Sequence, residues 1–262
     1  MTQAPSSSTP PRPFEALLLA AGLGTRLRPL TDNRPKALVE VDGETLLDIN
    51  IRRLAAAGAT HIVVNVHHLA DMIEDHLGRN TYPVALSLSD ERALLLDTGG
   101  TVARADALFS GQLPVVIHNV DVLSALNLAS LVAQHSEQHN LATLAVSSRN
   151  THRQLMARPD GRLAGWENKQ SGEQIVAASD VDPSHLTRWA FSGIAVVDPS
   201  LPKLLPPATR PYPIVPQYLR LASTHRIVCV PHSAADWLDV GKPETLALAS
   251  DFLASHAHSH TH

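Results

Sequence analysis

The segment 17-LLLAAGLGTRLRPLTDNRPKALVEV-41 holds residues whose types and spacing suit phosphate chemistry. An apolar run ends in a loop of small residues, and Arg26 and Lys36 follow within a short span. The N–H groups of a glycine turn can cradle an anion, and the two side chains add positive charge. Such a loop suits a polyphosphate whose charge must be neutralised while a bond breaks.

This loop fits neither of two common phosphate-binding motifs. A dinucleotide fingerprint needs a third small residue where Leu27 stands, followed by a long helix that Pro29 and Pro35 prevent. A P-loop needs Gly-Lys-Ser/Thr, whereas the sequence reads 24-GTR-26. Taken alone, the segment is equally well explained as a tight turn with two solvated cations, so other motifs must decide.

Strands alternate with helices around this loop. Apolar runs predict buried strands, and helical periodicity predicts the helices between them. The expected strands are 14–21, 61–66, 82–88, 114–123 and 141–148, and the expected helices are 44–57, 69–77, 98–108 and 127–139. This alternation predicts an α/β fold whose mostly parallel sheet is covered by helices on both faces.

Ligands of such sheets bind at the carboxyl ends of the strands. Polar groups fall there: 22–36 follows the first strand, 97-DTGG-100 precedes a helix, and Asp121 ends the strand at 114–120. Asp239 is far away in sequence but also lies beside an apolar stretch, so the fold can bring the two aspartates together. Each aspartate also has a simpler explanation, Asp121 as a strand-end cap and Asp239 as the start of a turn.

From about Thr151 the pattern changes. The chain then predicts a hairpin around an Asp-Gly turn at 156–174, a strand at 188–197, a helix near 216–223, a strand at 225–231 and a helix from about Pro243. There are no repeats and no clear linker, so residues 14–255 are expected to form one domain with an inserted second half. Residues 1–13 are expected to be a disordered tail, and 256–262 a His-rich solvated tail.

Composition argues against several classes of protein. The chain has 262 residues, of which 44% are hydrophobic, and a formal net charge of -4, which gives no general affinity for nucleic acid or anionic lipid. No run is long enough to span a membrane and the N-terminus lacks a secretory signal, so we expect a cytoplasmic protein. The single cysteine, Cys229, lies in an apolar stretch and is expected to be a buried, unreactive thiol.

Several segments together resemble the sugar-1-phosphate nucleotidyltransferases. The stretch 19-LAAGLGTRLRPLT-31 with 34-RPKALVEV-41 is similar to that family's G-x-G-T-R-L-x-P-L-T loop and the P-K pair that follows it. Further matches extend over nearly the whole chain, namely DTGGTV (97–102), HNVDVL (118–123), WAFSGIAVVDPSL (189–201) and DWLDVGKPETL (236–246). The chain is most similar to the short N-acetylmuramate-1-phosphate uridylyltransferase-like type.

The resemblance implies a fold and a reaction. The fold would be a Rossmann-like, mixed, mostly parallel sheet flanked by helices, the nucleotide-diphospho-sugar transferase fold. Residues 14–150 would form its nucleotide-binding half, and 151–255 would form a sugar-binding insertion. The reaction would be Mg²⁺-dependent nucleotidyl transfer from a nucleoside triphosphate to a sugar-1-phosphate, which yields a nucleotide-sugar and pyrophosphate. In this subtype the nucleotide-sugar would serve the cell wall.

The identity of the substrates stays open at this stage. UTP with an N-acetylmuramate-1-phosphate-like sugar is favoured, and GTP or dTTP with mannose-, heptose- or glucose-1-phosphate are alternatives. A non-catalytic, regulatory binder of nucleotide-sugars is a second function, which the loss of a charged motif residue would have favoured. A dinucleotide-dependent oxidoreductase conflicts with Leu27 and the prolines. An alcohol-phosphate cytidylyltransferase would normally carry a His-x-Gly-His motif, which this sequence lacks. We expect no nucleic acid or membrane partner, and a monomer or small homo-oligomer.

The same resemblance assigns roles to individual residues. Asp121 and Asp239 would hold Mg²⁺, Arg26 would hold the departing pyrophosphate, and Lys36 would contact the phosphates from the other side. The nucleotide-binding residues would be Ala20, Ala21, Gly22, Gly24, Thr25, Arg26, Lys36, Thr98, Gly99, Gly100 and Asn119. The sugar-binding residues would be Glu167, Lys169, Ser192 and Gly193, although the first two could form an exposed hairpin tip and the last two a buried strand.

A few polar residues depart from the pattern or stand outside it. Val120 occupies the position of the family's usual glycine, and Asn127 lies where some relatives carry a carboxylate, so Asp239 is expected to complete the metal site. His118 is expected to pack within its strand. The trio His67, His68 and Asp71 has metal-like composition but lies at a strand–helix junction, where a solvated loop is expected.

Overall fold

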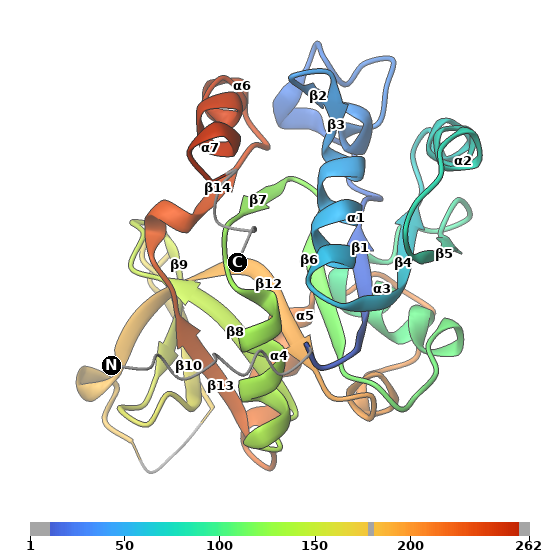
Figure 1. Ribbon diagram of the computed structural model, residues 1–262. Coiled ribbons are helices and arrows are strands. Elements are labelled where there is room, and N and C mark those ends of the chain that lie inside the picture. The colour runs from blue at the N-terminus through green and yellow to red at the C-terminus, as the bar shows by residue number, and fades with distance from the viewer. Residues whose placement is uncertain (1–10, 178–180, 257–262) are drawn as a thin grey trace, which may run out of the picture.

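The computed structural model describes residues 11–177 and 181–256, which form a twisted central sheet with helices packed on both faces (Figure 1). The main sheet has ten strands in the order β11-β10-β9-β12-β6-β1-β4-β5, and β8 pairs with both β12 and β13. Its strands are β1 (Phe14–Leu19), β4 (Ala59–Val66), β5 (Ala85–Asp90), β6 (Val115–Asn119), β8 (Ala142–Ser147), β9 (Arg153–Ala157), β10 (Leu163–Asn168), β11 (Glu173–Val176), β12 (Thr187–Val197) and β13 (Ile227–Pro231).

The strands of the first half run parallel. β1 pairs in parallel with β4 and β6, and β4 pairs in parallel with β5. Continuous apolar runs form these strands because both faces of a parallel sheet are covered. Along β1, Ala16 and Leu18 belong to one hydrophobic core and Leu17 to the other, so consecutive side chains fill opposite faces.

Helices cover the two faces in separate groups. Buried residues of α1 (Leu46–Ala56), α2 (Ala70–Arg79) and α4 (Leu128–Glu137) belong to the first core. Buried residues of α3 (Asp97–Ala105) and α5 (Ile214–Ala222) belong to the second core. The prediction of a mixed, mostly parallel sheet flanked by helices is therefore confirmed.

The second half of the chain joins the same sheet through antiparallel strands. β12 pairs with β6, β8 and β9, and β9 continues through β10 to β11 (Figure 1). The expected hairpin forms between β9 and β10, and Gly161 in its turn adopts a φ of 81°, which favours glycine. The sheet is thus continuous across both halves of the chain.

The expected strand at 114–123 is in fact two strands. β6 ends at Asn119, and β7 (Val122–Ser124) leaves the main sheet to pair with β14 (Trp237–Asp239). The side chain of Asn50 on α1 donates a hydrogen bond to the carbonyl of Val120 and holds the chain where it bends. An unbroken apolar run could not show this break, because both strands are buried.

The remaining elements are short. The expected helix at 44–57 begins only after β3 (Glu44–Thr45), which pairs with β2 (Glu40–Val41), because Thr45 caps α1 by accepting a hydrogen bond from the N–H of Asp48. The helix expected from Pro243 is divided into α6 (Pro243–Leu246) and α7 (Ala249–His256). Single turns of 3₁₀ helix lie at Thr25–Leu27, Lys36–Leu38, Asp106–Leu108, Pro183–His185, Leu201–Leu204 and Ala234–Asp236.

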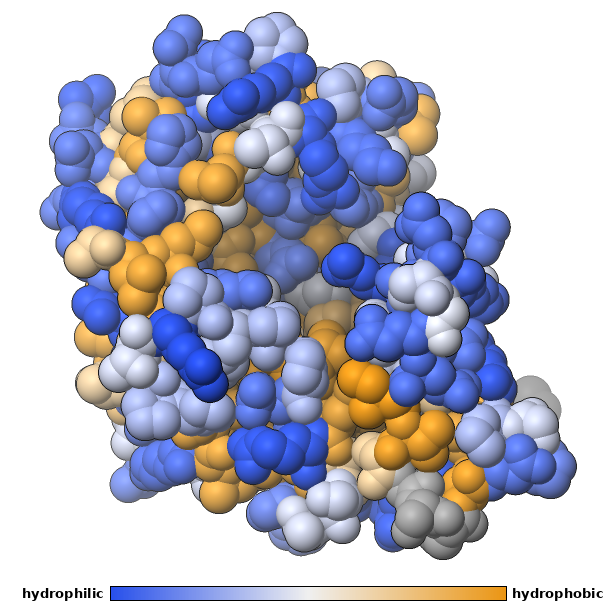
Figure 2. Space-filling model, turned by 180° about the vertical axis from the view of Figure 1, so that it is seen from behind, coloured by the Kyte–Doolittle hydropathy of each residue, from blue (hydrophilic) through white to orange (hydrophobic). Residues whose placement is uncertain are grey.

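Two of the sequence predictions concern the ends of the chain. The tails predicted at 1–13 and 256–262 lie almost entirely outside the described residues. Within the part of the chain that the structure describes, no helix has the length and apolar character needed to cross a bilayer. Hydrophilic and hydrophobic residues are interspersed on the face shown in Figure 2, which is hollowed near its middle.

Candidate active site

The structure brings Asp121 and Asp239 together. Asp121 lies in the bend between β6 and β7, and Asp239 ends β14. The antiparallel pairing of β7 with β14 sets Asp239 opposite Val122, and the N–H of Val240 donates to the carbonyl of Asp121 at 2.9 Å. This small sheet, rather than the main one, therefore positions the two carboxylates.

Arg26 and Lys36 lie against these carboxylates. Lys36 Nζ is 2.7 Å from Asp121 Oδ2, a charge-assisted hydrogen bond. Arg26 spans the pair, with Nη2 3.5 Å from Asp121 Oδ2 and Nη1 3.6 Å from Asp239 Oδ2. The Lys36 side chain is 14% exposed and the Arg26 side chain 51%, so Arg26 is the cation that a ligand can reach without rearrangement.

The glycine loop folds tightly around Lys36. Gly24 has a φ of 65°, and its carbonyl accepts a hydrogen bond from Thr31 Oγ1 at 2.7 Å. A Cβ on Gly24 would lie 3.0 Å from Thr31 and 3.2 Å from Lys36, so glycine is needed for space as well as for backbone conformation. Buried Leu27 anchors the short turn after the loop, while Gly22 remains exposed at its front.

The N–H groups of Ala20 and Ala21 already have partners within the protein. Both donate to Asn65 Oδ1, at 2.7 and 3.2 Å. Asn65 Nδ2 in turn donates to buried Glu91 and Thr101. The sequence analysis missed this network, although an Asn inside the apolar run HIVVNV was a usable signal because buried polar groups need partners.

The glycines of the 97-DTGG-100 segment make room for a neighbouring loop. The N–H groups of Gly99 and Gly100 both donate to the carbonyl of Tyr212, at 2.9 and 3.3 Å. A Cβ on Gly99 would lie 2.5 Å from the Tyr212 ring. Thr98 Oγ1 accepts a hydrogen bond from the N–H of Ile214 and caps the approach to α5. Of Thr98, Gly99 and Gly100, only Thr98 lines the cleft described next, so a direct nucleotide contact for the two glycines stays a prediction.

A cleft of about 300 Å³ opens in front of the aspartates. Thr98, Leu19 and residues of α5 line one part of it, and Phe191, Ser192, Gly193 and Trp237 line a second part. Arg26, Asn119, Asp121 and Asp239 also line it. Arg26 and the two aspartates therefore share one cavity at the carboxyl ends of β1 and β6, where ligands of such sheets bind, and Lys36 lies behind it against Asp121.

Two predicted sugar-site residues, Ser192 and Gly193, line the cleft together with Phe191 and Trp237. Gly193 has a φ of 70°, and a Cβ there would lie 2.6 Å from Asn119 Nδ2, so glycine lets Asn119 reach the cleft. Ser192 is 1% exposed. Its hydroxyl lies 2.7 Å from His232 Nε2, and its carbonyl accepts a hydrogen bond from Trp237 Nε1 at 2.7 Å. Ser192 thus holds this part of the cleft in place with both of its oxygens.

The other two predicted sugar-site residues lie elsewhere. Glu167 lies near the end of β10, and its carboxylate pairs with Arg188 at 3.4 Å. It does not line the cleft. Lys169 follows β10 and is exposed, and it does not line the cleft. A sugar contact for either residue stays a prediction that this arrangement does not support.

Gly241 is a site residue that the sequence analysis did not single out. A Cβ at this position would lie 2.6 Å from Arg26 Nη2 and 2.8 Å from both Asp121 Oδ2 and Asp239 Oδ1. Its N–H also donates to Asp239 Oδ1 at 2.8 Å. The glycine directly after Asp239–Val240 was the available signal, since close approach of charged groups to the backbone requires a residue without a side chain.

Arg149 is the second site residue that was missed. Its guanidinium stacks on the Trp237 ring, with Cζ 3.5 Å from the ring centroid. Nε donates to Ser147 Oγ at 3.1 Å and Nη2 donates to the carbonyl of Phe191 at 2.7 Å. Burial lowers the pKa of Arg149, while the charge of Asp239 acts in the opposite direction. No local sequence motif marks this arginine.

The two aspartates have the donor chemistry that Mg²⁺ needs. Mg²⁺ prefers oxygen ligands and is commonly held by one or two carboxylates together with phosphate oxygens of the substrate. Asp121 Oδ2 and Asp239 Oδ1 approach the same point beside Gly241, so the residues present fit the ion. Asn127 is not part of this set, because its side chain caps α4 by accepting from the N–H of Ser130.

The histidines outside the cleft make structural contacts. Within the described ranges, no three His, Cys, Asp or Glu side chains gather as a metal cluster. His67 contacts the carbonyl of Glu91 at 2.7 Å, and Asp71 pairs with Arg92 at 2.7 Å. His118 is fully buried, as predicted, and burial lowers its pKa to about 4.

The predicted environment of Cys229 is also confirmed. The thiol is buried in the second core, and burial raises its pKa to about 12. A thiol with a raised pKa is a weak nucleophile because little thiolate forms near neutral pH.

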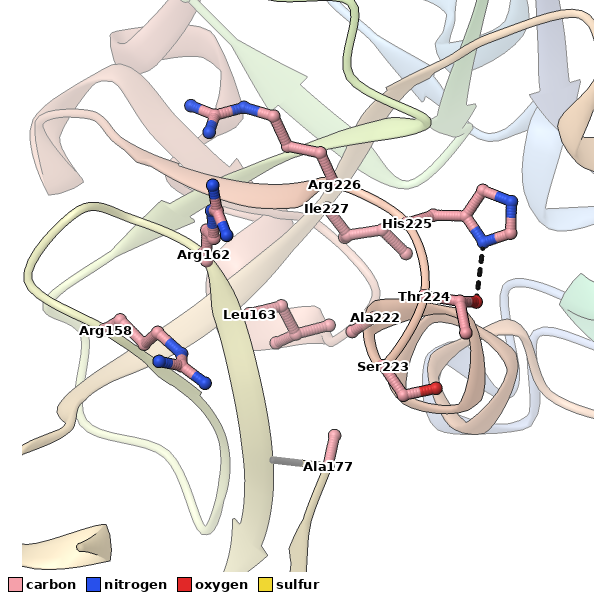
Figure 3. A pocket seen from close by; sticks show the side chains of 10 residues that line it. All are labelled: Arg158, Arg162, Leu163, Ala177, Ala222, Ser223, Thr224, His225, Arg226 and Ile227. Carbon is pink, nitrogen blue, oxygen red and sulfur yellow. Dashed lines mark hydrogen bonds between the residues drawn. The ribbon is translucent and has the colours of Figure 1, made fainter. Parts of the chain in front are cut away.

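A second cavity of about 540 Å³ lies away from the aspartates, between β10 and the end of α5 (Figure 3). Arg158, Arg162 and Arg226 point around it. Arg162 is paired with Asp160 at 3.3 Å, and Arg226 donates to Asn140 Oδ1 at 2.7 Å. Its cations already have protein partners, and the cavity contains none of the predicted site residues.

Comparisons with known proteins identify the family of the chain. The sequence model of the nucleotidyl transferase family matches residues 15–155. The chain is 33% identical over 249 residues to the N-acetylmuramate alpha-1-phosphate uridylyltransferase of Caulobacter vibrioides, covering 92% of this chain and 98% of that protein. It is 27% identical over 233 residues to the mannose-1-phosphate guanyltransferase of Schizosaccharomyces pombe, covering 88% of this chain and 62% of that protein. Its fold matches the crystal structure of HddC from Yersinia pseudotuberculosis, with a TM-score of 0.71 at 19% identity over 91% of this chain and 98% of that one.

Proposed function

The chain belongs to the nucleotidyl transferase family as a sugar-1-phosphate nucleotidyltransferase, and from this premise we propose that it joins UTP and N-acetylmuramate-1-phosphate. The products are the uridine diphosphate sugar and pyrophosphate. The choice of substrates is supported by the uridylyltransferase relative, which this chain matches over 98% of that protein's length. The cytoplasmic location expected from the sequence stays a prediction.

One observation carries the proposal: two cations and two carboxylates meet at the mouth of one cleft. Arg26 lies within 3.6 Å of both Asp121 and Asp239, and Lys36 is 2.7 Å from Asp121. Two anionic substrates repel each other, so an enzyme that joins them must neutralise charge and align the reacting atoms. This cluster supplies cations for the phosphates and carboxylates for a metal ion at one place.

The reaction needs no covalent nucleophile from the protein. An oxygen of the sugar-1-phosphate attacks the α-phosphorus of UTP in line, and the bond to the bridging oxygen breaks to release pyrophosphate. Half-exposed Arg26 binds the leaving pyrophosphate and stabilises the charge that builds on it. Lys36, fixed by Asp121 and the glycine loop, binds the phosphates from the opposite side.

Mg²⁺ is part of this proposal, with Asp121 and Asp239 as its protein ligands. The bound ion would neutralise phosphate charge and orient the attack. In its absence the two carboxylates are balanced by Arg26 and Lys36, so the cluster is charge-compensated within the protein. Arg26 and Lys36 could exchange these carboxylate partners for phosphate oxygens of the substrates.

Pyrophosphate release tests the function. The purified protein is incubated with Mg²⁺, one of UTP, dTTP, GTP, CTP or ATP, and one of the 1-phosphates of N-acetylmuramate, N-acetylglucosamine, glucose, mannose and heptose. We expect the fastest release with UTP and N-acetylmuramate-1-phosphate, and none without Mg²⁺. A preference for GTP with mannose-1-phosphate would instead favour the function named for the fission-yeast relative. No release with any pair, together with tight binding of a nucleotide-sugar, would indicate a regulatory binder.

A further inference from the structure

Arg149 differs from the other cations of the cleft in having no carboxylate partner. Arg26 and Lys36 are both paired with the aspartates. Arg149 lines the same cleft, yet across residues 11–177 and 181–256 it forms no ion pair, and its hydrogen bonds go to a hydroxyl and a carbonyl. A half-buried positive charge without an anion is costly, so its retention in a binding cleft suggests an anion that arrives with the ligand.

The guanidinium is held in one orientation before any ligand binds. Trp237 covers one of its faces, and the contacts of Nε with Ser147 and of Nη2 with Phe191 fix its edge. Trp237 is itself fixed, because its N–H donates to the carbonyl of Ser192. These bonds leave both N–H groups of Nη1 without a partner in the described structure. A planar, pre-oriented guanidinium is the group best suited to bind a carboxylate.

The position of Arg149 favours the sugar over the nucleotide. It contacts Phe191 and Trp237, beside the predicted sugar-site residue Ser192, and within the part of the chain that the structure describes it makes no hydrogen bond to the predicted nucleotide-site residues. The cations that meet the phosphates, Arg26 and Lys36, lie together at the aspartates. Arg149 is therefore a third cation of the cleft, outside the ion-paired cluster and beside the segment expected to bind the sugar.

We propose that Arg149 binds a carboxylate carried by the sugar ring of the sugar-1-phosphate substrate, and so selects acidic sugars. This inference rests on the proposed function, because it takes the cleft to bind a sugar-1-phosphate. N-acetylmuramate is such an acid, since it is N-acetylglucosamine with a lactic acid in ether linkage. The phosphate and the N-acetyl group are common to both sugars, so the pair isolates the carboxylate.

The test compares these two sugars in the wild-type protein and in Arg149→Met. With UTP and Mg²⁺, we expect Arg149→Met to lower kcat/KM for N-acetylmuramate-1-phosphate by about 10–100-fold, the scale of one charge-assisted hydrogen-bonded pair. The value for N-acetylglucosamine-1-phosphate should change by less than about threefold, because that sugar has no carboxylate to lose. Arg149→Lys keeps the charge but not the planar fork, and should fall between wild type and Arg149→Met.

A matched control separates this effect from a general loss of charge. Arg162→Met removes an arginine outside the cleft and should leave both sugars unaffected. Thermal unfolding of each variant checks that the wall of Ser147, Phe191 and Trp237 is intact. Equal losses for both sugars in Arg149→Met, or no loss for either, would overturn the proposal, and so would a wild-type protein that prefers N-acetylglucosamine-1-phosphate.

Binding measured by calorimetry keeps this inference separate from the proposed function. Wild-type protein should bind N-acetylmuramate-1-phosphate more tightly than Arg149→Met does, whether or not turnover follows. Such binding without any pyrophosphate release would reject the proposed function and retain the role of Arg149. Turnover of N-acetylmuramate-1-phosphate that Arg149→Met leaves unchanged would retain the proposed function and reject the role of Arg149, and absence of N-acetylmuramate-1-phosphate binding would also reject the role of Arg149.

Discussion

At the scale of single residues, the site is a small balanced cluster of opposite charges. Arg26 contacts both aspartates, and Lys36 contacts one of them. The two cations differ in exposure: the Lys36 side chain is mostly buried against Asp121, whereas the Arg26 side chain is about half exposed to solvent. The first two predictions therefore concern the most exposed cation and the most buried carboxylate of the cluster.

Arg26→Ala should lower kcat by about 10²–10³-fold. Arg26 is expected to stabilise charge on the departing pyrophosphate, and losing one transition-state contact of this kind has that scale. Steady-state pyrophosphate release gives kcat and KM, with Arg28→Ala as the control, because Arg28 is exposed and pairs with Asp32 rather than with either site aspartate. A change confined to KM would mean that Arg26 assists binding alone.

Asp121→Asn should abolish Mg²⁺-dependent turnover and leave the protein folded. The substitution keeps the size of the side chain but removes the negative charge that Mg²⁺ and Lys36 require. Pyrophosphate release over a Mg²⁺ titration and a circular dichroism spectrum measure the two effects. The matched control is Asp251→Asn, at an exposed position of α7. Near-normal activity of Asp121→Asn would falsify the metal assignment.

At the scale of elements, a two-stranded sheet rather than the main sheet assembles the site. β7 and β14 come from distant parts of the chain, and their pairing sets Asp239 opposite Val122, next to Asp121. Gly241 follows β14 at the point where the charged groups converge. The geometry of the cluster therefore depends on a backbone that has no side chain at this position.

Gly241→Ala should reduce activity strongly with little effect on the rest of the fold. The added methyl would lie 2.6 Å from Arg26 and 2.8 Å from both aspartates, so the cluster must spread apart. Pyrophosphate release and thermal unfolding measure the outcome. Gly78→Ala is the control, because nothing lies within 4 Å of the point that its methyl group would occupy, and α2 should gain about 0.5–1 kcal/mol in stability from the better helix former. Equal activity of both variants would argue that the cluster has spare room.

At the scale of the whole molecule, one sheet separates two cores, and buried histidines lie within the structure. His118 on β6 and His135 on α4 are 0% and 2% exposed. Burial lowers the pKa of each to about 4, from an ordinary value of 6.5. Each is therefore neutral in the folded protein at pH 5, where an unfolded chain would bind a proton.

Stability should fall as the pH drops from 7 to 5. Between the lowered folded pKa and the unfolded value, the unfolded chain holds more protons, so acid favours unfolding. Each histidine should cost about 1–2 kcal/mol of unfolding free energy over this range. Urea unfolding at both pH values measures the change. His135→Asn should show a smaller difference between the two pH values, and His225→Gln, at an exposed position, an unchanged one. A protein equally stable at both pH values would contradict these buried neutral histidines.

Much of this molecule was open to prediction from local sequence. The alternation of apolar runs with helical periodicity predicted the sheet and its helices, because strand and helix burial leave different periods in the sequence. Arg26, Asp121 and Asp239, each chosen from a motif in its own segment, line one cleft in the structure. Their chemical roles remain predictions for the variants above.

Only the tertiary structure decided where the other groups go. The N–H groups of Ala20 and Ala21 are bonded to Asn65, and those of Gly99 and Gly100 to Tyr212, so contacts expected with a nucleotide are made within the protein. Gly241 and Arg149 belong to the site because they contact residues that are far away in the sequence, Arg26 and Asp121 for Gly241 and Trp237 for Arg149. Local sequence determines which polar groups a segment can offer. The partners of those groups are set by packing between segments that are far apart in the sequence, and a pattern within one segment does not contain that information.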